Sequence, residues 1–391
     1  MNRITSDWLT NRQTQRAMSL LTGAGFDTYA VGGCVRNDLL DVPVADIDIS
    51  TNAHPDKVIA LAEEAGLKSI PTGIEHGTIT VVIEGEPFEI TTFRADVETD
   101  GRRAVVRFAD SLFDDAIRRD FTMNALYVDQ EGVVTDPVGG LAHLAERRFV
   151  FIDDAQRRIR EDYLRILRYF RFMAWYGDPE NGFEAETLAA IAANLDGLDQ
   201  LSRERVGAEI IKLLSAENAA PAVAVMGQTR VLAHVLPGCD ANPLGIFDHH
   251  CAELGLACDP IARLAAIGLQ DGKALRLSKL DQKKLALFHS LIADMIPVAE
   301  IAYDHGAETA KQVLALRAAL FQQAPDRAEI ARVDEATHAT FPLSPKDLMP
   351  DWQGVALGDA LRTAKHMWIA SDFKLRKSQI LAELKKLKSE G

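Results

Sequence analysis

The stretch from Tyr29 to Thr51 most constrains what this chain can fold into. It predicts a short apolar strand ending at Val31, a Gly-Gly turn, a helix from about Cys34 to Leu40, and a strand with the alternation Asp-Ile-Asp-Ile at residues 46–49. Because alternate strand residues face the same side, we expect Asp46 and Asp48 on one face. Paired carboxylates backed by an apolar face suit divalent cations, which prefer oxygen ligands.

The turn before the helix has the composition of a phosphate-binding loop. Gly32 and Gly33 have no Cβ, so an anion can approach their backbone N–H groups closely. The helix N-terminus favours negative charge, and Arg36 adds a guanidinium that fits phosphate oxygens. Gly-Gly before a helix and an exposed Asp-x-Asp are each common alone, and neither a Walker A loop nor G-x-G-x-x-G is present. Their combination is typical of a nucleotidyl-transfer centre.

The surrounding segments predict a small sheet. A helix is expected over residues 7–24 and another from His54 to about Ala65, followed by strands at about 67–70, 77–84 and 87–93. Glu89 lies in the third of these strands, where it is either an ordinary outward-facing glutamate or a third carboxylate beside Asp46 and Asp48. Residues 95–107 are charged and turn-forming, and we expect a mobile loop near the site.

A polar segment follows at residues 115–126. Arg119, Asp120 and Asn124 lie within one or two turns, where they can contact phosphate, ribose hydroxyl and backbone together. The alternative is a structural salt bridge between Arg119 and Asp120. Strands near 125–128 and 133–135 and a turn at 136–140 close the first domain.

From about residue 150 the pattern is helical only. An apolar stripe with helical period runs from Ile159 to Ala174. Asp162, Arg165 and Arg168 recur on another face, and Glu161 and Arg171 adjoin them. These residues are either helix-stabilising ion pairs or a rigid set of donors and acceptors for a nucleobase edge.

Composition limits the possible partners and compartment. With 391 residues the chain should hold two or more domains, and its net charge of −14 argues mildly against a protein coated in nucleic acid. Two basic stretches, at residues 147–171 and 362–391, nevertheless predict a localised RNA track or solvated helix faces. No run approaches the roughly 18 apolar residues of a membrane span and no signal peptide is evident, so we expect a cytoplasmic protein.

The cysteines predict no disulfide framework in so long a chain. Cys251 and Cys258 lie near His249 and His250, which raises a zinc hypothesis. Their spacing is wider than the usual C-x₂₋₄-C pair, so small core residues and a polar loop are the expected alternative.

In sequence order, these motifs resemble the class II tRNA nucleotidyltransferases, which are the bacterial CCA-adding enzymes and their poly(A) polymerase relatives. The matching motifs span roughly residues 25–215: Gly32-Gly33-Cys34-Val35-Arg36, Asp46-x-Asp48, Arg118-Arg119-Asp120-Phe121-Thr122-x-Asn124-Ala125, Glu161-Asp162-x-x-Arg165-x-x-Arg168-x-x-Arg171 and Glu204-Arg205. The family often has Asp directly after the cradle arginine, where this chain has Asn37.

The resemblance implies an α+β fold: a polymerase β-like nucleotidyltransferase head with a small mixed sheet, followed by an all-α neck, body and tail. The implied divisions are a head at 1–148, a nucleotide-selecting neck at 149–215, a body at 216–305 and a tRNA-binding tail at 306–391.

The resemblance also implies the chemistry. Asp46 and Asp48 would bind two Mg²⁺ ions, with Glu89 as the third catalytic carboxylate. The implied nucleotide-binding residues are Gly32, Gly33, Arg36, Arg119, Asp120, Asn124, Glu161, Asp162, Arg165, Arg168 and Arg171. The implied reaction adds CMP, CMP and AMP from CTP and ATP to the tRNA 3′ end and releases pyrophosphate.

Several alternatives stay open. Within the family they are a poly(A) polymerase and an enzyme that adds only CC or only A. The segment 68–78 lacks the Gly-Arg-Arg-Phe-like sequence that poly(A) polymerases tend to carry, which favours CCA addition. Two alternatives lie outside the activity of this family: a non-catalytic RNA-binding protein and a small-molecule nucleotidyltransferase. No membrane association is expected, and no protein partner can be named.

Overall fold

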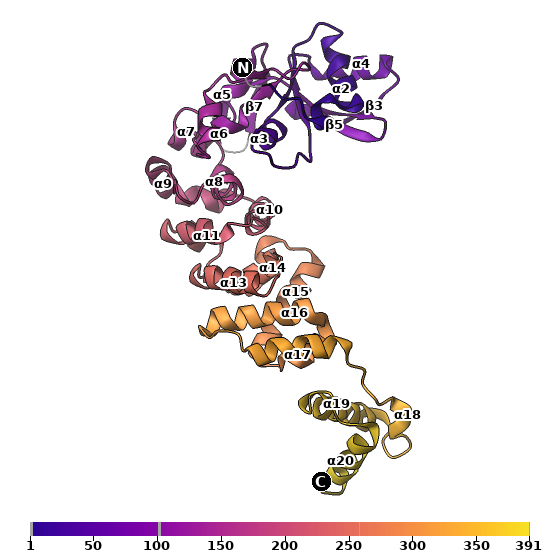
Figure 1. The fold of residues 1–391 in the computed structure, drawn as a ribbon. Coiled ribbons are helices and arrows are strands. Elements are labelled where there is room, and N and C mark those ends of the chain that lie inside the picture. The colour runs from indigo at the N-terminus through magenta and orange to yellow at the C-terminus, as the bar shows by residue number, and fades with distance from the viewer. Residues whose placement is uncertain (1–2, 101–102, 258, 391) are drawn as a thin grey trace. The chain divides into compact units, whose positions relative to one another are not determined.

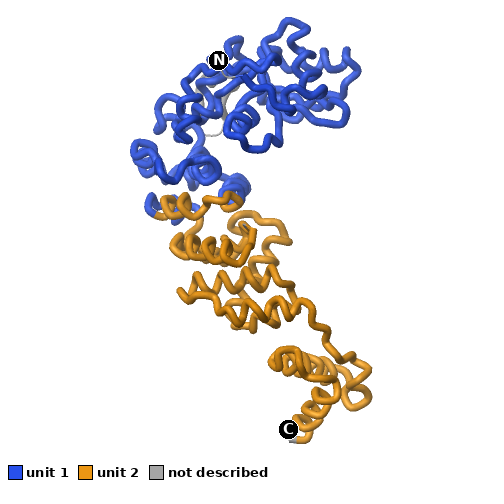
Figure 2. The backbone as a smooth tube through the Cα atoms, in the orientation of Figure 1, with its two compact units in different colours: residues 1–213, 228–235 blue, residues 214–227, 236–391 orange. Residues whose placement is uncertain are grey.

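The computed structural model describes residues 3–100, 103–257 and 259–390. The chain forms two compact units: residues 1–213 with 228–235, and residues 214–227 with 236–391 (Figure 2). The finer division at residues 148, 215 and 305 stays a prediction.

A seven-stranded mixed sheet organises the first unit (Figure 1). Its strands, in spatial order, are β3 (Lys68–Gly73), β4 (Thr78–Ile83), β5 (Glu86–Thr92), β2 (Asp48–Thr51), β1 (Thr28–Val31), β8 (Tyr127–Val128) and β9 (Val134–Thr135). β-Branched residues dominate β4, whose side chains at Ile79, Val81 and Ile83 are fully buried. The predicted strands at about 77–84 and 87–93 are confirmed as β4 and β5, which pair antiparallel as a hairpin.

The central strand β2 has two different neighbours. It pairs antiparallel with β1 and parallel with β5, with Asp48 opposite Glu89 in the parallel register. The chain between these two parallel strands contains α4 (Pro55–Glu64), as predicted, and the strands β3 and β4. This mixed pairing brings together two carboxylates about 40 residues apart in sequence.

The prediction of one helix over residues 7–24 is wrong in one respect, because the structure has two helices there. α1 (Asp7–Thr10) ends at Asn11, and α2 (Arg12–Thr22) begins directly after it. Asn11 has extended backbone and its side chain accepts a hydrogen bond from Thr14 N, so it acts as the N-cap of α2. The helix after the Gly-Gly turn, α3 (Gly33–Leu39), lies where the sequence predicts it.

The loop expected over residues 95–107 is instead a two-stranded antiparallel hairpin. β6 (Arg94–Asp100) pairs with β7 (Arg103–Phe108), from Arg94 opposite Phe108 to Asp100 opposite Arg103, with a register shift between Asp96 and Thr99. Gly101 and Arg102, part of that expected loop, lie outside the described residues. The charged composition of this segment predicted a loop, but strand pairing needs only backbone groups and alternation of side chains.

Helices complete the first unit. They are α5 (Leu112–Ile117), η2 (Thr122–Asn124), α6 (Gly140–Ala145), α7 (Ala155–Glu161), α8 (Leu164–Tyr176), α9 (Ala185–Ala192), η3 (Leu195–Gln200), α10 (Arg203–Leu214) and α12 (Val231–Val235). The apolar stripe predicted as one helix spans α7 and α8, which are separated at Asp162, whose backbone is extended (φ −154°, ψ 106°). The break turns the side chain of Asp162 away from the regular helical face.

The second unit is helical throughout its described residues. Its helices are α11 (Ala219–Gln228), α13 (Asn242–Glu253), α14 (Pro260–Ala266), η4 (Gly272–Leu275), α15 (Lys279–Ala293), α16 (Val298–Phe321), α17 (Arg327–His338), α18 (Pro345–Leu348), α19 (Gly354–Ala370) and α20 (Lys377–Glu390). A sheet-bearing head followed by helices confirms the predicted α+β class. In the described part of the chain, no helix has the length and apolar content to cross a membrane.

Candidate active site

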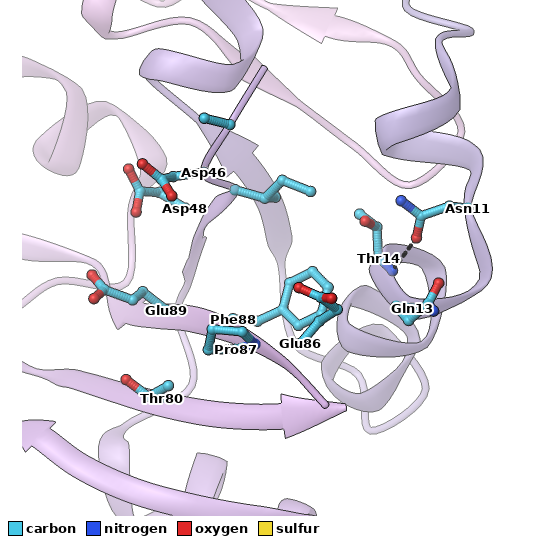
Figure 3. A pocket seen from close by; sticks show the side chains of 12 residues that line it. Asn11, Gln13, Thr14, Asp46, Asp48, Thr80, Glu86, Pro87, Phe88 and Glu89 are labelled. Atoms are coloured by element: carbon cyan, nitrogen blue, oxygen red, sulfur yellow. Dashed lines mark hydrogen bonds between the residues drawn. The ribbon is translucent and has the colours of Figure 1, made fainter. Parts of the chain in front are cut away.

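A cavity of about 690 Å³ opens beside the sheet where β2 begins (Figure 3). Asp46, Asp48 and Glu89 line it, and we call these three residues the carboxylate edge. Residues from α2 and from the start of β5, among them Thr14 and Glu86, line other parts of the wall. The structure therefore brings together all three carboxylates predicted from the sequence.

Asp46 reaches the cavity differently from the prediction. It lies two residues before β2, in irregular backbone, so Asp46 and Asp48 do not share a strand face. Two neighbours explain the late start of β2. The chain turns into α3 directly after β1, and Pro87, which would continue the ladder on β5 opposite Asp46, has no N–H to donate. Both carboxylates nevertheless lie side by side (Figure 3).

The carboxylate edge carries negative charge that is only partly compensated. Desolvation raises the pKa of Asp48, and the charges of Glu89 and Asp46 raise it further, against a lowering by Arg119. Among the described residues, none of the three carboxylates forms an ion pair within 4.0 Å, although such pairs occur elsewhere in the chain. Like charges held together without a partner favour a bound cation.

The donor set fits a divalent cation such as Mg²⁺. All three groups offer carboxylate oxygens, the ligands that hard cations prefer. Within the described residues their oxygens do not all lie within 4.8 Å of one another, so metal binding would draw Glu89 toward the aspartates. Glu89 is exposed, which leaves its side chain free to make that movement.

The zinc hypothesis for the second unit takes a different form in the structure. His249, His250 and Glu253 of α13 have ligand atoms within 4.8 Å of one another, and Glu253 had not been predicted. Cys251 is buried and is not one of this group, while Cys258 lies outside the described residues. His250 and His249 pair with Glu253 at 2.9 and 3.6 Å, as solvated helix neighbours do.

The glycines of the predicted cradle have separate roles. Gly32 has a positive φ of 75°, and its N–H donates to the Leu126 carbonyl at 3.1 Å, so this N–H is not available to an anion. A Cβ on Gly32 would meet Asn124 O at 3.5 Å and Arg119 Nη1 at 3.6 Å. The expectation that both N–H groups receive phosphate is therefore wrong for Gly32, and for Gly33, which begins α3, it stays a prediction.

Arg36 lies buried behind Gly33. Its guanidinium donates to Asn124 Oδ1 at 2.5 Å, to Tyr176 Oη at 3.1 Å and to Asn37 Oδ1 at 2.8 Å. Asn37, the departure from the family pattern, in turn donates to the Pro43 carbonyl at 3.1 Å. Desolvation lowers the pKa of Arg36 and the nearby charge of Arg171 adds to the lowering, while Tyr176 and Asp120 oppose it.

Asn124 continues this network to α8. Its amide donates to Asp120 Oδ1 at 3.0 Å, and the other Asp120 oxygen pairs with Arg168 at 2.5–2.7 Å. Burial raises the pKa of Asp120, but the Arg168 charge and the Asn124 hydrogen bond outweigh it and hold that pKa below its ordinary value. Three of the predicted nucleotide-binding residues thus form one chain of contacts with Arg36.

Arg119 is held by a residue that the sequence reading missed. Its guanidinium pairs with Asp115 Oδ2 at 2.9 Å and donates to Tyr127 Oη at 3.0 Å and Ser50 Oγ at 3.2 Å. Asp115 is fully buried and also pairs with Arg118 at 2.5 Å. The alternative salt bridge between Arg119 and Asp120 is wrong, because Asp115 lies one helical turn before Arg119 and takes that position.

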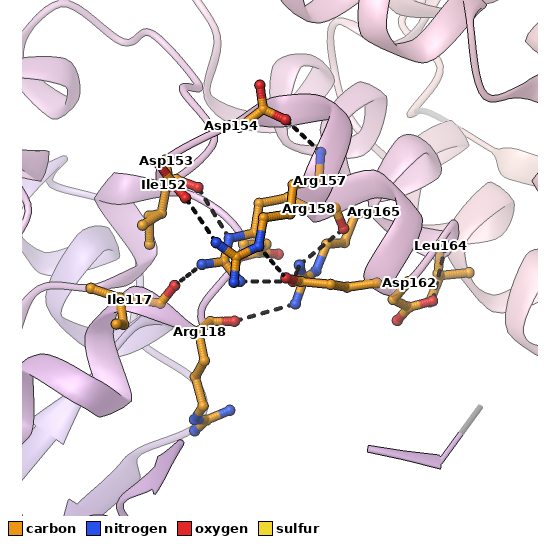
Figure 4. A network of polar contacts seen from close by, with 12 residues as sticks. Ile117, Arg118, Ile152, Asp153, Asp154, Arg157, Arg158, Asp162, Leu164 and Arg165 are labelled. Carbon is orange, nitrogen blue, oxygen red and sulfur yellow. Dashed lines mark hydrogen bonds and ion pairs between the residues drawn. The ribbon is translucent and has the colours of Figure 1, made fainter. Parts of the chain in front are cut away.

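The neck residues lie in two separate contact sets. Glu161 accepts from Arg158 and Arg165, each at 2.7 Å, and Arg165 also donates to the carbonyls of Arg158 and Arg118 (Figure 4). Asp162 pairs instead with Arg205 of α10 at 2.6 Å. Asp162 and Arg165 therefore bind different partners, as the break between α7 and α8 requires.

A second group of charges surrounds the ring of Phe172 on α8. The guanidinium carbons of Arg36, Arg168 and Arg171 lie 5.1, 5.1 and 4.2 Å from the ring centroid, and we call these three residues the arginine cluster. Arg171 pairs with Glu209 of α10 at 2.6 Å. Such cation–π contacts hold guanidinium planes in fixed positions.

The sequence reading missed Asp115, Arg158, Phe172, Tyr176 and Glu209. Asp115 is three and four residues before Arg118 and Arg119, a spacing that signals helical ion pairs. Phe172 and Tyr176 follow Arg168 at i+4 and i+8, a spacing that could have placed them on its face. Nothing local marks Glu209, whose partner lies 38 residues away.

Comparisons with known proteins agree with this geometry. Residues 28–150 match the family model of the poly A polymerase head domain, and residues 182–242 match the model described as a probable RNA and SrmB-binding site of polymerase A. The chain is 31% identical over 376 residues to the mitochondrial CCA tRNA nucleotidyltransferase 1 of Mus musculus, covering 91% of this chain and 86% of that protein.

Bacterial relatives match over a shorter stretch at higher identity. The CCA-adding enzyme of Geobacillus thermodenitrificans is 41% identical over 216 residues, which is 55% of this chain and 52% of that protein, so the chain matches about half the length of this relative.

A solved structure matches nearly the whole chain. The Bacillus stearothermophilus CCA-adding enzyme in complex with CTP has a TM-score of 0.74 at 27% identity, covering 97% of this chain and 98% of that one. The Thermotoga maritima CCA-adding enzyme complexed with tRNA shares the fold, with a TM-score of 0.69 at 17% identity. The chain is a nucleotidyltransferase and belongs to the family of class II CCA-adding enzymes and poly(A) polymerases.

Proposed function

We propose that this protein adds CMP, CMP and AMP to the 3′ end of tRNA, using CTP and ATP and releasing pyrophosphate. The observation that carries the proposal is the carboxylate edge, where Asp48 lies opposite Glu89 on parallel strands and Asp46 shares their cavity. The full-length likeness to the mouse enzyme named for CCA addition supports the substrate. The likeness to a structure with bound CTP supports the nucleotide.

In this proposal Asp46, Asp48 and Glu89 hold two Mg²⁺ ions. The bound ions supply Lewis-acid activation of the tRNA 3′-hydroxyl and charge stabilisation at the leaving pyrophosphate. The protein supplies alignment: the attacking oxygen, the α-phosphorus and the leaving oxygen must lie nearly in line. The 3′-hydroxyl loses its proton to solvent, its oxygen forms the new bond to the α-phosphorus, and the bond from that phosphorus to the pyrophosphate oxygen breaks.

The other residues predicted from the sequence bind different parts of the nucleotide. Gly33 and Arg36 bind the triphosphate, while Arg119, Asp120 and Asn124 position sugar and phosphate from the other side of the same network. Asp162 and Arg165 read the Watson–Crick edges of CTP and ATP. Their partners Arg205 and Glu161 hold them in place before the nucleotide binds. Arg168 and Arg171 support the phosphates or that base-reading pair.

The role of the tail and the compartment stay predictions. The helical tail is proposed to contact tRNA, and the cytoplasm is the proposed compartment, although the similar mouse protein is named as mitochondrial.

The test is 3′-end sequencing of tRNA transcripts that end at the discriminator base, at C or at CC. Each transcript is incubated with Mg²⁺ and CTP, ATP or both. Defined stops at CCA support the proposal. Long A tails would identify a poly(A) polymerase, and a stop at CC, or extension of CC ends only, would identify a partial enzyme. No incorporation by a folded protein would overturn the enzymatic function.

A further inference from the structure

The last turn of α8 presents one aromatic ring to solvent. Of the residues of α8, all of which the structure describes, only Trp175 is exposed, with an exposed fraction of 45%. Its indole N–H donates to the backbone carbonyl of Lys212 on α10 at 2.7 Å. Because this N–H is the one polar group of the side chain and is already bonded, the exposed part of Trp175 is apolar ring.

The ring of Trp175 is held in place from two sides. The hydrogen bond to Lys212 ties it to α10, and the ring of Tyr176 lies beside it, with centroids 6.3 Å apart and planes inclined by 39°. A tryptophan side chain has only two rotatable bonds, so little conformational entropy is left to lose when a ligand binds. Trp175 is therefore a preorganised aromatic surface.

Positive charge accompanies this ring on both helices. Arg171 is one helical turn before Trp175 on the same face of α8, where it pairs with Glu209. Lys212 is exposed, and its ammonium group forms no ion pair within 4.0 Å in the described part of the chain. Proteins bind single-stranded nucleic acids with this combination, in which an aromatic ring stacks on a base and a cation contacts the phosphate backbone.

The place of Trp175 along α8 indicates which base it meets. Ten residues separate it from Arg165, which is about 15 Å along the axis at 1.5 Å per residue. Successive stacked bases of one strand are about 3.4 Å apart, so this length corresponds to about four of them. In the proposed function Arg165 reads the incoming nucleotide. Trp175 therefore lies beyond that nucleotide, within reach of the last few nucleotides of the RNA chain that accepts it.

We propose that Trp175 stacks on an unpaired base among the last few nucleotides of the tRNA 3′ end, while Lys212 contacts a neighbouring phosphate. The inference rests on the proposed function and deepens it, because it assigns a binding surface to the acceptor RNA instead of the incoming nucleotide. Stacking accepts any base, since every base has a π-face. One ring can therefore serve RNA ends that finish at the discriminator base, at C or at CC.

Replacing the ring tests the stacking. For Trp175→Leu we expect the Kd for a tRNA transcript ending at CC to rise about tenfold, with KM for CTP unchanged. Trp175→Phe keeps an aromatic ring and should raise this Kd by less than about threefold. Phe113→Leu removes another exposed ring of the same unit, 52% exposed on α5, and as the matched control it should change neither constant. Thermal unfolding of each variant checks its fold.

Abasic transcripts identify the stacked base. Transcripts that lack one base at a time over the last four positions are bound to the unmodified chain and to Trp175→Leu. Removing the stacked base should weaken binding to the unmodified chain about tenfold and hardly change binding to Trp175→Leu, because the ring is already absent there. Unchanged tRNA affinity in Trp175→Leu, additive losses at every position, or an equal rise in KM for CTP would overturn the proposal.

Tryptophan fluorescence gives a readout that does not depend on catalysis. Trp352 and Trp368 are buried and Trp8 is partly buried, so Trp175 is the one exposed tryptophan of the four. Binding of tRNA should quench the emission of the unmodified chain, and this quenching should disappear in Trp175→Phe although the RNA still binds. Quenching of the same size in Trp175→Phe would reject Trp175 as the stacking ring.

These experiments distinguish the two proposals. Loss of tRNA affinity and of the abasic effect in Trp175→Leu, in a protein that adds no nucleotides to tRNA, supports the role of Trp175 and rejects CCA addition. Normal CCA addition with unchanged tRNA affinity in Trp175→Leu supports the activity and rejects the role of Trp175.

Discussion

The carboxylate edge and the arginine cluster are two charged regions of one unit, and they handle charge in opposite ways. The carboxylate edge gathers Asp46, Asp48 and Glu89 with no ion-pair partner among the described residues. In the arginine cluster, Arg168 and Arg171 each have a carboxylate partner, and only Arg36 relies on neutral groups. The carboxylate edge therefore depends on ligands for charge balance, whereas most of the cluster is balanced by the fold itself.

This difference teaches which substitutions separate activity from stability. Removing charge from a repulsive group relieves a destabilising interaction, while removing one partner of a buried pair leaves an uncompensated charge. Neutralising a residue of the carboxylate edge should therefore reduce the stability of the protein little. Neutralising a paired residue of the arginine cluster, or its carboxylate partner, should reduce stability much more.

The largest effect is expected on activity, from Asp46→Asn combined with Asp48→Asn. Nucleotide addition should fall by at least about a thousandfold, because the proposed metal ligands are lost. The midpoint of thermal unfolding should stay the same or rise, because like-charge repulsion is relieved. Incorporation into tRNA and thermal unfolding are measured on the same preparation. Glu86→Gln, on β5 and in the same cavity wall, is the control; a large fall in stability of the double variant would contradict the comparison.

The largest effect on stability is expected from Asp115→Asn. This fully buried carboxylate serves Arg118, Arg119 and Tyr127, so its loss should reduce the free energy of unfolding by about 3–5 kcal/mol. Urea unfolding measures the change. The neighbouring Asp114 forms no ion pair within the described residues, and Asp114→Asn should change stability by less than about 1 kcal/mol. If the two substitutions reduce stability by similar amounts, the buried ion pairs of Asp115 are not the cause of the loss.

The pH dependence of stability tests the contribution of the paired carboxylate Asp120. Its pKa is below the ordinary value in the folded chain, so the folded state binds its proton more weakly than the unfolded state. The stabilisation is present at neutral pH and is lost as pH falls below about 4, toward the lowered pKa. Asp120→Asn should cost about 2 kcal/mol at pH 7 and flatten the acid limb of stability against pH. An unchanged acid limb would exclude this carboxylate as its source.

The smallest effect on stability is expected from Arg205→Ala. The pair with Asp162 is partly exposed, with side-chain exposures of 48% and 34%, so the free energy of unfolding should change by about 0.5 kcal/mol or less. Releasing Asp162 should nevertheless lower kcat/KM for CTP about tenfold, because its orientation is no longer fixed. Steady-state kinetics with CTP and ATP checks this. Arg203→Ala, at the start of the same helix, is the control.

The sequence predicted the parts of this site that depend on local pattern. The Gly-Gly turn, the helix with Arg36, the Asp-x-Asp spacing and the strand with Glu89 all carry their signal within a few residues. Alternation and β-branched residues mark strands such as β4, whereas the head and its mixed sheet were implied by the family resemblance.

The errors arose where distant partners decide the structure. Asp46 lies off the strand because its neighbours on both sides, the turn after β1 and Pro87 on β5, cannot extend the ladder. Asp162 lies outside the helix it was assigned to, and its partner is 43 residues away on α10. The hairpin of β6 and β7 needs pairing between strands that composition alone does not reveal.

The parallel pairing of β2 with β5 has a consequence for how the protein folds. Hydrogen bonds between these strands form only after the intervening chain of about 40 residues has closed into a loop, which costs entropy before any contact is gained. Until that closure, Asp48 and Glu89 belong to separate, solvated segments. The rate at which the unfolded chain regains metal affinity should therefore follow the closing of this crossover, and metal binding becomes a kinetic reporter of head-domain folding.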